Sequence, residues 1–226
     1  MVAQRLNGLL GKADLTEVKQ VLDIGSWHLG QSIEFASIFK EARIDAFEPV
    51  PDSYKLCIKT WEKLDEQKKS RINVHNIAVS NEAGEIPFYP VDAALSSVPN
   101  IGASSMFKFI DGLNGSPFGQ TLIQKEITVK AETLDTWCIA NNITDIDIMW
   151  VDVQGSELHV FQGAEQILKN TKIIMTEVGL KPYYDGHTLK KDIDAFLATH
   201  DFKELEGSFE VNVPGYEANV IYVKTA

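Results

Sequence analysis

The chain has 226 residues, 44% of them hydrophobic, and carries a formal net charge of −11. This length suits one α/β domain, and the hydrophobic fraction is sufficient for a full core. Because excess negative charge repels nucleic acid and anionic membranes, we expect neither as a partner. No apolar run reaches the roughly 18 residues that a membrane span requires.

The cysteine usage and the N-terminal residues favour a cytoplasmic protein. Cys57 and Cys138 lie far apart in helical patterns, which predicts two buried thiols rather than a disulfide. Residues 1–11 lack the apolar centre and the cleavage site of a signal peptide. The sequence gives no indication of the oligomeric state.

Strand-like runs alternate with helical runs, which is typical of parallel βαβ units. In the first half we expect strands at 18–24, 43–47 and 72–79 and helices at 30–41 and 51–64. Extended segments follow at 84–89 and 123–131. In the second half we expect helices at 133–140, 156–169 and 188–199, strands at 146–153, 172–178, 202–206 and 217–224, and a turn at 211–215. The last two strands suggest a closing antiparallel hairpin.

A stretch rich in Ser, Gly, Asn and Pro occupies about residues 91–120. Loops of this length inside a compact domain are usually functional or disordered. We interpret it as a lid or substrate loop on a hairpin-like insertion within a single domain that spans residues 1–226. A mobile surface loop is the alternative interpretation.

Two acidic residues stand at the predicted carboxyl ends of neighbouring strands, where parallel sheets bind ligands. Asp23 belongs to the run Val21-Leu22-Asp23-Ile24-Gly25, and Glu48 follows Phe47. Glu48 can accept hydrogen bonds from both ribose hydroxyls, and Asp23 suits an ammonium group. Together they predict a site for a nucleoside with a charged tail. The alternatives are an exposed loop acid for Glu48 and a helix N-cap for Asp23.

The segment from Asp23 to Gly30 predicts a glycine-bearing turn into a helix. Glycine allows the backbone to approach a ligand, and free N–H groups at a helix N-terminus bind a carboxylate or phosphate. The dinucleotide fingerprint G-x-G-x-x-G is absent, because Asp23 stands in place of its first glycine and the gap from Gly25 to Gly30 is too wide. This disfavours NAD.

Six motifs occur in order along the chain: Val21-Leu22-Asp23-Ile24-Gly25, Phe47-Glu48-Pro49, Asn76-Ile77-Ala78-Val79-Ser80 with Gly84, Ser104-Ser105, Glu132-Thr133-Leu134-Asp135, and Val151-Asp152-Val153-Gln154-Gly155-Ser156-Glu157 with Gly163-Ala164. From about residue 20 to Glu177, the chain resembles the FkbM family of S-adenosylmethionine-dependent methyltransferases. This implies a class I methyltransferase fold: an α/β, Rossmann-like, doubly wound, mostly parallel seven-stranded sheet with an antiparallel last strand. The expected strands agree.

The resemblance also implies roles for single residues in binding S-adenosylmethionine. Asp23 and Gly25 would line the methionine end, and Glu48 would hold the ribose. Asn76 and Ile77 would border the adenine. The remaining predicted cofactor-binding residues are Ser26, Gly30, Pro49 and Asp152.

Two positions depart from the family pattern. The glycine turn is one residue longer than usual, with Ser26-Trp27-His28-Leu29 filling it. Gln154 stands where the Asp-x-Glu-Gly motif has a carboxylate, which removes one charge from the end of the fourth strand and weakens any acid–base role at position 154.

Methylation of a hydroxyl requires a general base or a metal, because a protonated hydroxyl is a poor nucleophile. Asp152 and Glu177, at the ends of the fourth and fifth strands, are the candidates, and His187 is an alternative base. For Asp152 the alternative is a buried acid bonded to backbone N–H groups. Glu157, in the first turn of the following helix, is a weaker candidate, and its alternative role is stabilisation of the helix dipole. A divalent cation is conceivable but unassigned, because two carboxylates make a thin ligand shell.

We therefore predict an O-methyltransferase that acts on a hydroxyl of a saccharide or small metabolite. The resemblance carries the prediction of the acceptor, since the residues themselves indicate only a cofactor site. Two alternatives stay open. One is an NAD-type oxidoreductase. The other is a non-catalytic, nucleoside-binding methyltransferase relative, which is retained because Gln154 replaces a carboxylate of the family motif.

Overall fold

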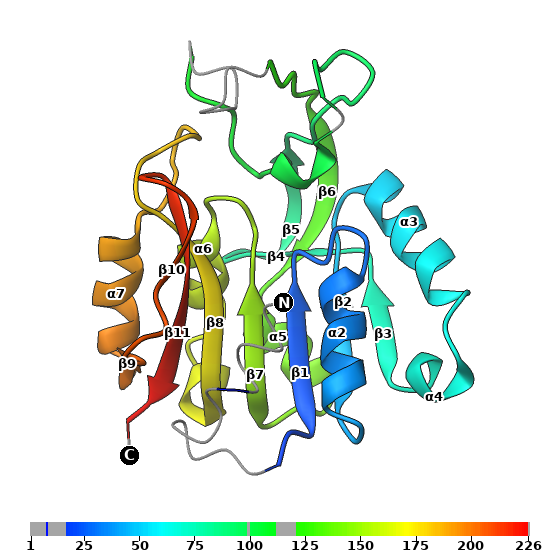
Figure 1. Ribbon diagram of the computed structural model, residues 1–226, viewed down its shortest axis with the longest axis vertical. Coiled ribbons are helices and arrows are strands. Elements are labelled where there is room, and N and C mark those ends of the chain that lie inside the picture. Colours follow the sequence, from blue (N-terminus) through cyan, green and yellow to red (C-terminus); the bar gives the residue numbers. More distant parts are fainter. Residues whose placement is uncertain (1–7, 9–16, 99, 112–120, 226) are drawn as a thin grey trace.

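A computed structural model describes residues 8, 17–98, 100–111 and 121–225, and its centre is a twisted sheet (Figure 1). The spatial order of the strands is β10 (Glu210–Val213), β11 (Glu217–Lys224), β8 (Thr171–Gly179), β7 (Ile146–Val151), β1 (Gln20–Ile24), β2 (Arg43–Phe47) and β3 (Ile72–His75), with β9 (Phe202–Glu204) also paired to β11. The five strands from β8 to β3 are parallel, and β11 is antiparallel to β8. This confirms the expected fold class.

The edge of the sheet differs from the expectation in one respect. The segment 211–215 was expected as a turn, but Glu210–Val213 forms β10, which pairs with one half of β11 while β9 pairs with the other half. The position of one edge strand is thus shared by two short strands. The antiparallel closing arrangement itself is present.

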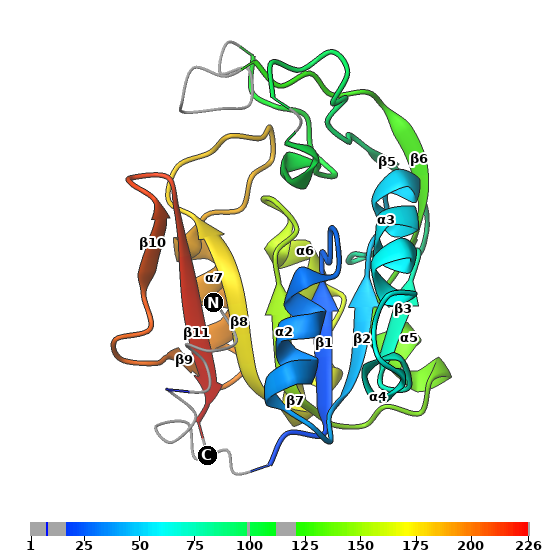
Figure 2. The same cartoon turned by 45° about the vertical axis from the view of Figure 1, so that its right-hand side comes forward.

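Helices cover both faces of the sheet (Figure 2). One face carries α2 (Gly30–Ile38), α3 (Pro51–Trp61) and α4 (Glu66–Lys69), and the other carries α5 (Leu134–Ala140), α6 (Glu157–Gln162) and α7 (Lys190–Ala198). Alternate residues of β1 enter the two cores, Val21 with Phe35 of α2 and Leu22 with Phe161 of α6. The central strands are therefore hydrophobic on both faces, as parallel sheets require.

The topology places a binding site between β1 and β7. From β1 the chain proceeds outward to β2 and β3, and it later returns to β7 and moves outward the other way to β8. In open α/β sheets, ligands bind outside the carboxyl ends of the strands at such a switch point. The residues that follow β1 and β7 are thus expected to line the site.

A second, three-stranded sheet stands beyond the carboxyl ends of the main strands (Figure 1). It contains β4 (Ala78–Val79), β6 (Ile127–Glu132) and β5 (Gly84–Phe88), with β5 antiparallel to β6. The single strand expected at 72–79 is wrong, because the chain leaves the main sheet after His75 and enters the small sheet at Ala78. This break sets Asn76 and Ile77 at the edge of the site.

The long segment between β5 and β6 folds back over the main sheet. It contains the 3₁₀ helix η1 (Ile101–Ala103), and residues 112–120 of the expected loop lie outside the described part of the chain. The Ile110 N–H donates to the Tyr183 carbonyl at 2.8 Å, and the rings of Phe109 and Tyr184 stack with centroids 5.1 Å apart. We call residues 100–110 the covering segment. Its role as a lid stays a prediction.

The helix expected at 156–169 is interrupted. It divides into α6 and the 3₁₀ helix η2 (Ile167–Asn170), with Gly163 at the end of α6. A Cβ atom at Gly163 would lie 2.1 Å from the Ser80 carbonyl oxygen, so the backbones meet too closely for any side chain. Contact with the 76–80 segment therefore outweighs helical continuity.

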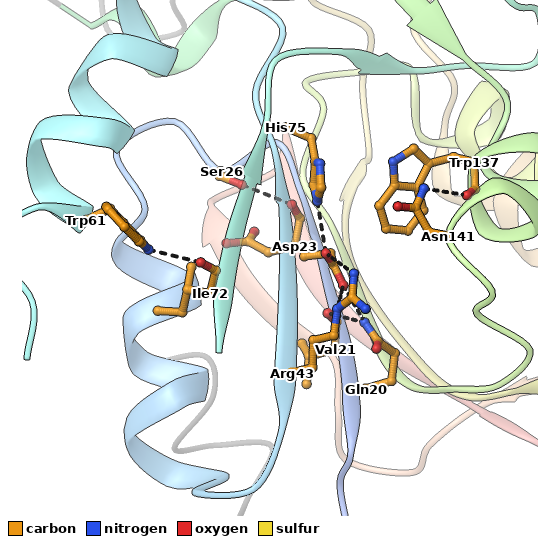
Figure 3. Close-up of polar contacts among 11 residues, drawn as sticks. Gln20, Val21, Asp23, Ser26, Arg43, Trp61, Ile72, His75, Trp137 and Asn141 are labelled. Carbon is orange, nitrogen blue, oxygen red and sulfur yellow. Dashed lines mark hydrogen bonds and ion pairs between the residues drawn. The ribbon is translucent and has the colours of Figure 1, made fainter. Parts of the chain in front are cut away.

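Several further expectations can be compared with the structure. Cys57 and Cys138 are free and buried, as predicted. His75 has a structural role, since with Gln20 and Arg43 it binds the fully buried carboxylate of Asp45 (Figure 3). No helix within the described residues is both long and apolar enough to cross a lipid bilayer.

Candidate active site

The turn after β1 crosses the ends of three strands. The N–H groups of Gly25 and Ser26 both donate to the Phe47 carbonyl at 3.0 Å. Gly25 has φ +94°, and a Cβ there would lie 1.9 Å from the Asp152 carbonyl oxygen, so only glycine fits. Trp27 has φ +48°, a strained value that often marks a functional site.

Asp23 lies beneath this turn. Its carboxylate is fully buried and accepts a hydrogen bond from the Ser32 hydroxyl, while Ser26 Oγ donates to the Asp23 carbonyl at 3.0 Å (Figure 3). Oδ1 has no partner within the described residues, and burial raises the pKa of Asp23 to about 6. Leu29, not Asp23, is the N-cap of α2. The N-cap interpretation of Asp23 is therefore wrong.

Glu48 is only 6% exposed, so the interpretation as an exposed loop acid is wrong. Its two carboxylate oxygens each accept one backbone N–H, from Trp27 and from Val50, both at 2.9 Å. Burial raises the pKa of Glu48 to about 7, against the lowering effect of these bonds. Each oxygen still has a free lone pair for a ligand hydroxyl.

Glu48 is the acid of a pocket with mostly apolar walls, which we call the apolar pocket. Its lining residues are Ile24, Gly25, Trp27, Phe47, Glu48, Pro49, Val50, Ser53, Ile77, Ala78, Val79, Ile86, Phe88, Ile101, Gly102, Ser104, Met106, Val153 and Ser156. The predicted residues Gly25, Glu48, Pro49 and Ile77 thus come together here. Asn76 does not line it; its side-chain amide instead donates to the carbonyls of Glu48 and Pro49 at 2.8 and 3.1 Å.

A second cavity adjoins the first, and the two share Gly25, Trp27 and Gly102. We call it the polar pocket, and its lining residues are Gly25, Ser26, Trp27, His28, Gly30, Gln31, Asn100, Gly102, Ala103, Trp150, Asp152, Gln154, Glu177, Asn212, Glu217 and Asn219. It brings together the predicted Ser26, Gly30, Asp152 and Glu177. Asp23 and His187 line neither pocket.

Asp152 and Glu177 are joined by a side-chain amide. Gln154 Nε2 donates to Asp152 Oδ1 at 2.7 Å and to Glu177 Oε2 at 2.8 Å. Asn212 Nδ2 donates to the other oxygen of Glu177 at 2.8 Å. The Asp152 carboxylate is thus held by a side chain rather than by backbone N–H groups, contrary to the alternative interpretation. Burial raises the pKa of both acids, and the charge of Asp152 raises that of Glu177 further.

Glu217, Asn212 and Asn219 also line the polar pocket, and none of them was predicted from the sequence. Burial and the charge of Asp152 raise the pKa of Glu217 to about 7, and no hydrogen bond to its carboxylate occurs among the residues that the structure describes. Asn212 and Asn219 bind each other through their amides at 2.9 and 3.0 Å. The i, i+2 spacing of Glu217 and Asn219 on an expected strand is the signal that could have found them.

Glu157 stands in the first turn of α6, where stabilisation of the helix dipole was expected, and its carboxylate also holds the backbone that precedes the helix. It is 1% exposed, and Oε1 accepts the N–H groups of Val153 and Gly155 at 3.2 and 3.0 Å. Burial raises the pKa of Glu157 to about 8. The residue therefore fixes the backbone that carries Gln154.

His187 packs behind the site. Its Nδ1 accepts the Tyr183 N–H at 3.1 Å, and its ring contacts the backbone at Gly155 and Gly179. Burial lowers the pKa of His187 to about 4. In this position it supports the loop that follows β8. As for metals, no cluster of three or more His, Cys, Asp or Glu side chains suited to an ion is present in the described part of the chain.

The sheet order and a strand-end site at the switch point define a class I methyltransferase fold, and solved structures share it. The magnesium protoporphyrin IX methyltransferase ChlM from Synechocystis PCC 6803, with bound S-adenosylmethionine, has a TM-score of 0.55 at 10% identity and covers 99% of this chain and 78% of its own. TrmK of M. capricolum, in complex with S-adenosylhomocysteine, has a TM-score of 0.50 at 13% identity and covers 98% of this chain and 68% of its own.

Sequence comparison gives the family. The profile of the methyltransferase FkbM domain matches residues 24–204, and the chain therefore belongs to the FkbM methyltransferase family. The 2-O-methyltransferase NoeI of Sinorhizobium fredii strain NGR234 is 28% identical over 185 residues, which are 82% of this chain and 72% of NoeI. The expected class of enzyme, an S-adenosylmethionine-dependent methyltransferase, is confirmed.

Proposed function

We propose that the protein transfers a methyl group from S-adenosylmethionine to a hydroxyl of a saccharide or a small hydroxyl-rich metabolite. The observation that carries this proposal is the junction of the two pockets over Gly25 and Trp27. An apolar cavity with one ribose-binding acid opens there onto a cavity lined by paired carboxylates. Such an arrangement would place a nucleoside bound in one cavity beside a general base in the other.

The residues of the apolar pocket fit the nucleoside part of the cofactor. Phe47, Ile77 and Val79 offer apolar walls to an adenine ring, and Glu48 offers fixed acceptors to the ribose hydroxyls. The turn from Gly25 to Gly30 lines the polar pocket and would hold the methionine part. When bound, S-adenosylmethionine supplies an electrophilic methyl group.

Asp23 acts in this proposal through the turn rather than by direct contact. Its carboxylate lies below Ser26 and beside Ser32 in the first turn of α2. A buried acid in that place fixes the course of the turn, and its negative charge favours an ammonium group bound above it. This revises the direct contact expected from the sequence.

The proton of the acceptor hydroxyl would go to the Asp152–Glu177 pair. Raised pKa values make these carboxylates stronger bases than exposed ones. His187 is less suited, because Nδ1 is already bound and burial keeps the imidazole a weak base. Asp152 therefore becomes the leading candidate for the base, with Glu177 as its partner.

The charge of the polar pocket supports an acceptor without negative charge. Of the residues that the structure describes, Asp152, Glu177 and Glu217 line it together with three asparagines and two glutamines, without any Lys or Arg. Carboxylates and amides bind sugar hydroxyls, whereas the negative charge of the carboxylates repels phosphates and uronates. That NoeI is a 2-O-methyltransferase supports hydroxyl methylation.

Calorimetric titration with S-adenosylhomocysteine and with NAD tests the cofactor first. We expect binding of S-adenosylhomocysteine and none of NAD, and a preference for NAD would overturn the proposal. A panel with methyl-labelled cofactor then compares neutral sugars, uronic acids and amines of similar size. Transfer to neutral sugars supports the proposal, and transfer confined to uronic acids or to amine nitrogen contradicts it.

A further inference from the structure

Gln154 occupies a strained and central position in the polar pocket. Its φ of +55° lies in the left-handed region, which is unfavourable for a residue with a side chain. Its amide nitrogen has two hydrogens, and the structure directs one to Asp152 and the other to Glu177. Backbone strain that persists at a site with such contacts points to a functional constraint.

The hydroxyl of Tyr184 meets two acceptors. It lies 3.0 Å from the Ala103 carbonyl oxygen and 3.2 Å from Gln154 Oε1. A phenol has one hydrogen, so only one of these oxygens receives it at a time. If the amide turned by 180°, its NH₂ group would donate to the Tyr184 oxygen and leave that hydrogen for Ala103. The buried tyrosine can therefore accommodate both orientations of the amide.

The turned amide makes a different demand on the carboxylates. It presents Oε1 to Asp152 and Glu177, and an amide oxygen only accepts hydrogen bonds. One of the two acids must then carry a proton to donate. The orientation of Gln154 is thus linked to the protonation of the pair.

The acids around the pair favour retention of one proton on it, and the two N–H groups of Gln154 oppose this by stabilising the ionised carboxylates. Glu217 of β11, Glu157 of α6 and Asp23 of β1 all face Asp152 or Glu177, whose pKa values are raised. Within the described residues the lining of the polar pocket contains His28 but neither Lys nor Arg. Acids that interact this strongly lose their protons in two separate steps. The apparent pKa of each step describes the pair rather than a single residue.

The same residue is tied to the covering segment. Ser105 Oγ donates to the Gln154 carbonyl oxygen at 2.7 Å, and Tyr184 connects the amide to Ala103. The covering segment therefore contacts both the backbone and the side chain of Gln154. A change in the backbone or in the side chain of Gln154 would therefore alter its hydrogen bonds to the two carboxylates.

We propose that Gln154 is a positioning residue whose amide turns with the protonation of the Asp152–Glu177 pair, holding the pair ionised before methyl transfer and accepting its new O–H afterwards. This rests on the proposed function. The acceptor oxygen keeps the electron pair of its broken O–H bond and uses it to form the bond to the methyl group. The bond from that methyl group to the sulfonium sulfur of the co-substrate breaks, and its electron pair stays on sulfur. The proton goes to one carboxylate, whose new O–H donates a hydrogen bond to Gln154 Oε1, and water later accepts the proton from the carboxylic acid.

The test follows the side-chain amide of Gln154 by ¹⁵N–¹H NMR in the cofactor-free protein, where the signal is the one missing from Gln154→Met. We expect the chemical shift of this amide to change over the same pH range as the carboxyl signals of the pair. These carboxyl signals are assigned with Asp152→Asn and Glu177→Gln. An amide signal that stays constant while the carboxyls titrate overturns the proposal.

The second readout is the apparent pKa of the pair. Gln154→Met removes the two N–H groups that stabilise the fully ionised pair and should raise the higher of the two steps, the loss of the last proton, by at least about one pH unit. Gln162→Met, at an exposed position on α6, should leave it unchanged. An unshifted step in Gln154→Met contradicts the proposal. If that variant does not fold, Tyr184→Phe replaces it and should alter the pH response of the amide signal, and an unaltered response counts against the proposal.

Titration with S-adenosylhomocysteine separates this inference from the proposed function. Binding of S-adenosylhomocysteine within about threefold of wild type in Gln154→Met and in Tyr184→Phe shows an intact cofactor pocket. Failure of the wild type itself to bind would refute the proposed function. The NMR titration would still report whether Gln154 responds to the carboxylates.

Discussion

The two pockets hold their acids in different ways. In the apolar pocket, backbone N–H groups of Trp27 and Val50 fix both oxygens of Glu48. In the polar pocket, side-chain amides of Gln154 and Asn212 hold Asp152 and Glu177. Backbone donors cannot rotate away or reverse, whereas a carboxamide can present either a donor or an acceptor.

This difference separates binding from proton transfer. In the proposed function Glu48 accepts the same two ribose hydroxyls in every cycle, so donors that never change suit it. A carboxylate that must gain and lose a proton needs partners that tolerate both states. The comparison predicts that variants of the two pockets will affect different measured quantities.

Asp152→Asn should have the largest effect on turnover. The amide keeps the shape of the side chain but cannot act as a base, and general bases typically contribute about 10²–10⁴-fold. We expect a loss of kcat in this range, measured with the best acceptor from the panel. Affinity for S-adenosylhomocysteine should stay within about threefold, because the variant leaves the apolar pocket intact.

Asp145→Asn provides the matched control, since Asp145 is exposed and lies just before the same strand. It should retain full activity. Wild-type turnover in Asp152→Asn would remove the proposed base. An equal loss of turnover and cofactor affinity would mean that the two pockets cannot be separated in this way.

Glu48→Ala should affect the opposite quantity. It removes the proposed ribose acceptor and leaves the Trp27 and Val50 N–H groups unpaired. A hydrogen bond to a charged group contributes about 1.5–3 kcal/mol. We expect affinity for S-adenosylhomocysteine to fall by about 10–100-fold in calorimetry. Glu85→Ala, at an exposed position on β5, is the control. Unchanged affinity in Glu48→Ala would exclude Glu48 from the cofactor site.

The fold was largely predictable because its signals are local. Short apolar runs such as Val21–Ile24 and Ile146–Val151 are buried on both faces and alternate with helices, which specifies a parallel sheet. The breaks at Asn76 and Gly163 were missed because they arise from contacts with distant segments: the carbonyls of Glu48 and Pro49 in one case and Ser80 in the other. Periodicity contains no information on such contacts.

The site divides in the same way. Glu48 and Asp152 follow strands directly, so strand-end reasoning found them. Asn212 and Glu217 reach the polar pocket from the antiparallel edge, where a residue at the start or end of a strand can face the site. His187 was chosen for its sequence proximity to Glu177, but the packing of its ring against Gly155 and Gly179 takes it behind the pocket.

Stability should fall as the pH rises from about 5 to 8. Burial raises the folded-state pKa of Glu157 from 4.5 to about 8, that of Glu48 to about 7 and that of Asp23 to about 6. In this window the folded chain binds more protons than the unfolded chain, so each of these acids destabilises the fold as it ionises. Asp45, whose pKa is lowered by its partners, contributes the opposite trend only below its ordinary pKa of 3.8.

Thermal unfolding measures this effect. A loss on the order of 2 kcal/mol corresponds to a Tm decrease of roughly 4–8 °C for a chain of this size. Glu157→Gln should flatten the pH dependence, whereas Glu165→Gln, at an exposed position nearby, should not. A Tm that rises from about pH 5.5 to about pH 8 would contradict the buried, protonated state of Glu157.

Glu217→Gln should have the smallest effect and the most selective one. Glu217 has no hydrogen-bond partner for its carboxylate among the described residues, so the amide should fit without breaking a contact. Loss of an acceptor for one hydroxyl contributes about 1 kcal/mol, which predicts an increase of about fivefold in the KM for the sugar acceptor. Because the charge of Glu217 raises the pKa of Glu177, its removal should also extend activity to lower pH. Glu206→Gln, at an exposed position, is the control. A weakened cofactor affinity in Glu217→Gln would contradict the assignment of Glu217 to the acceptor site.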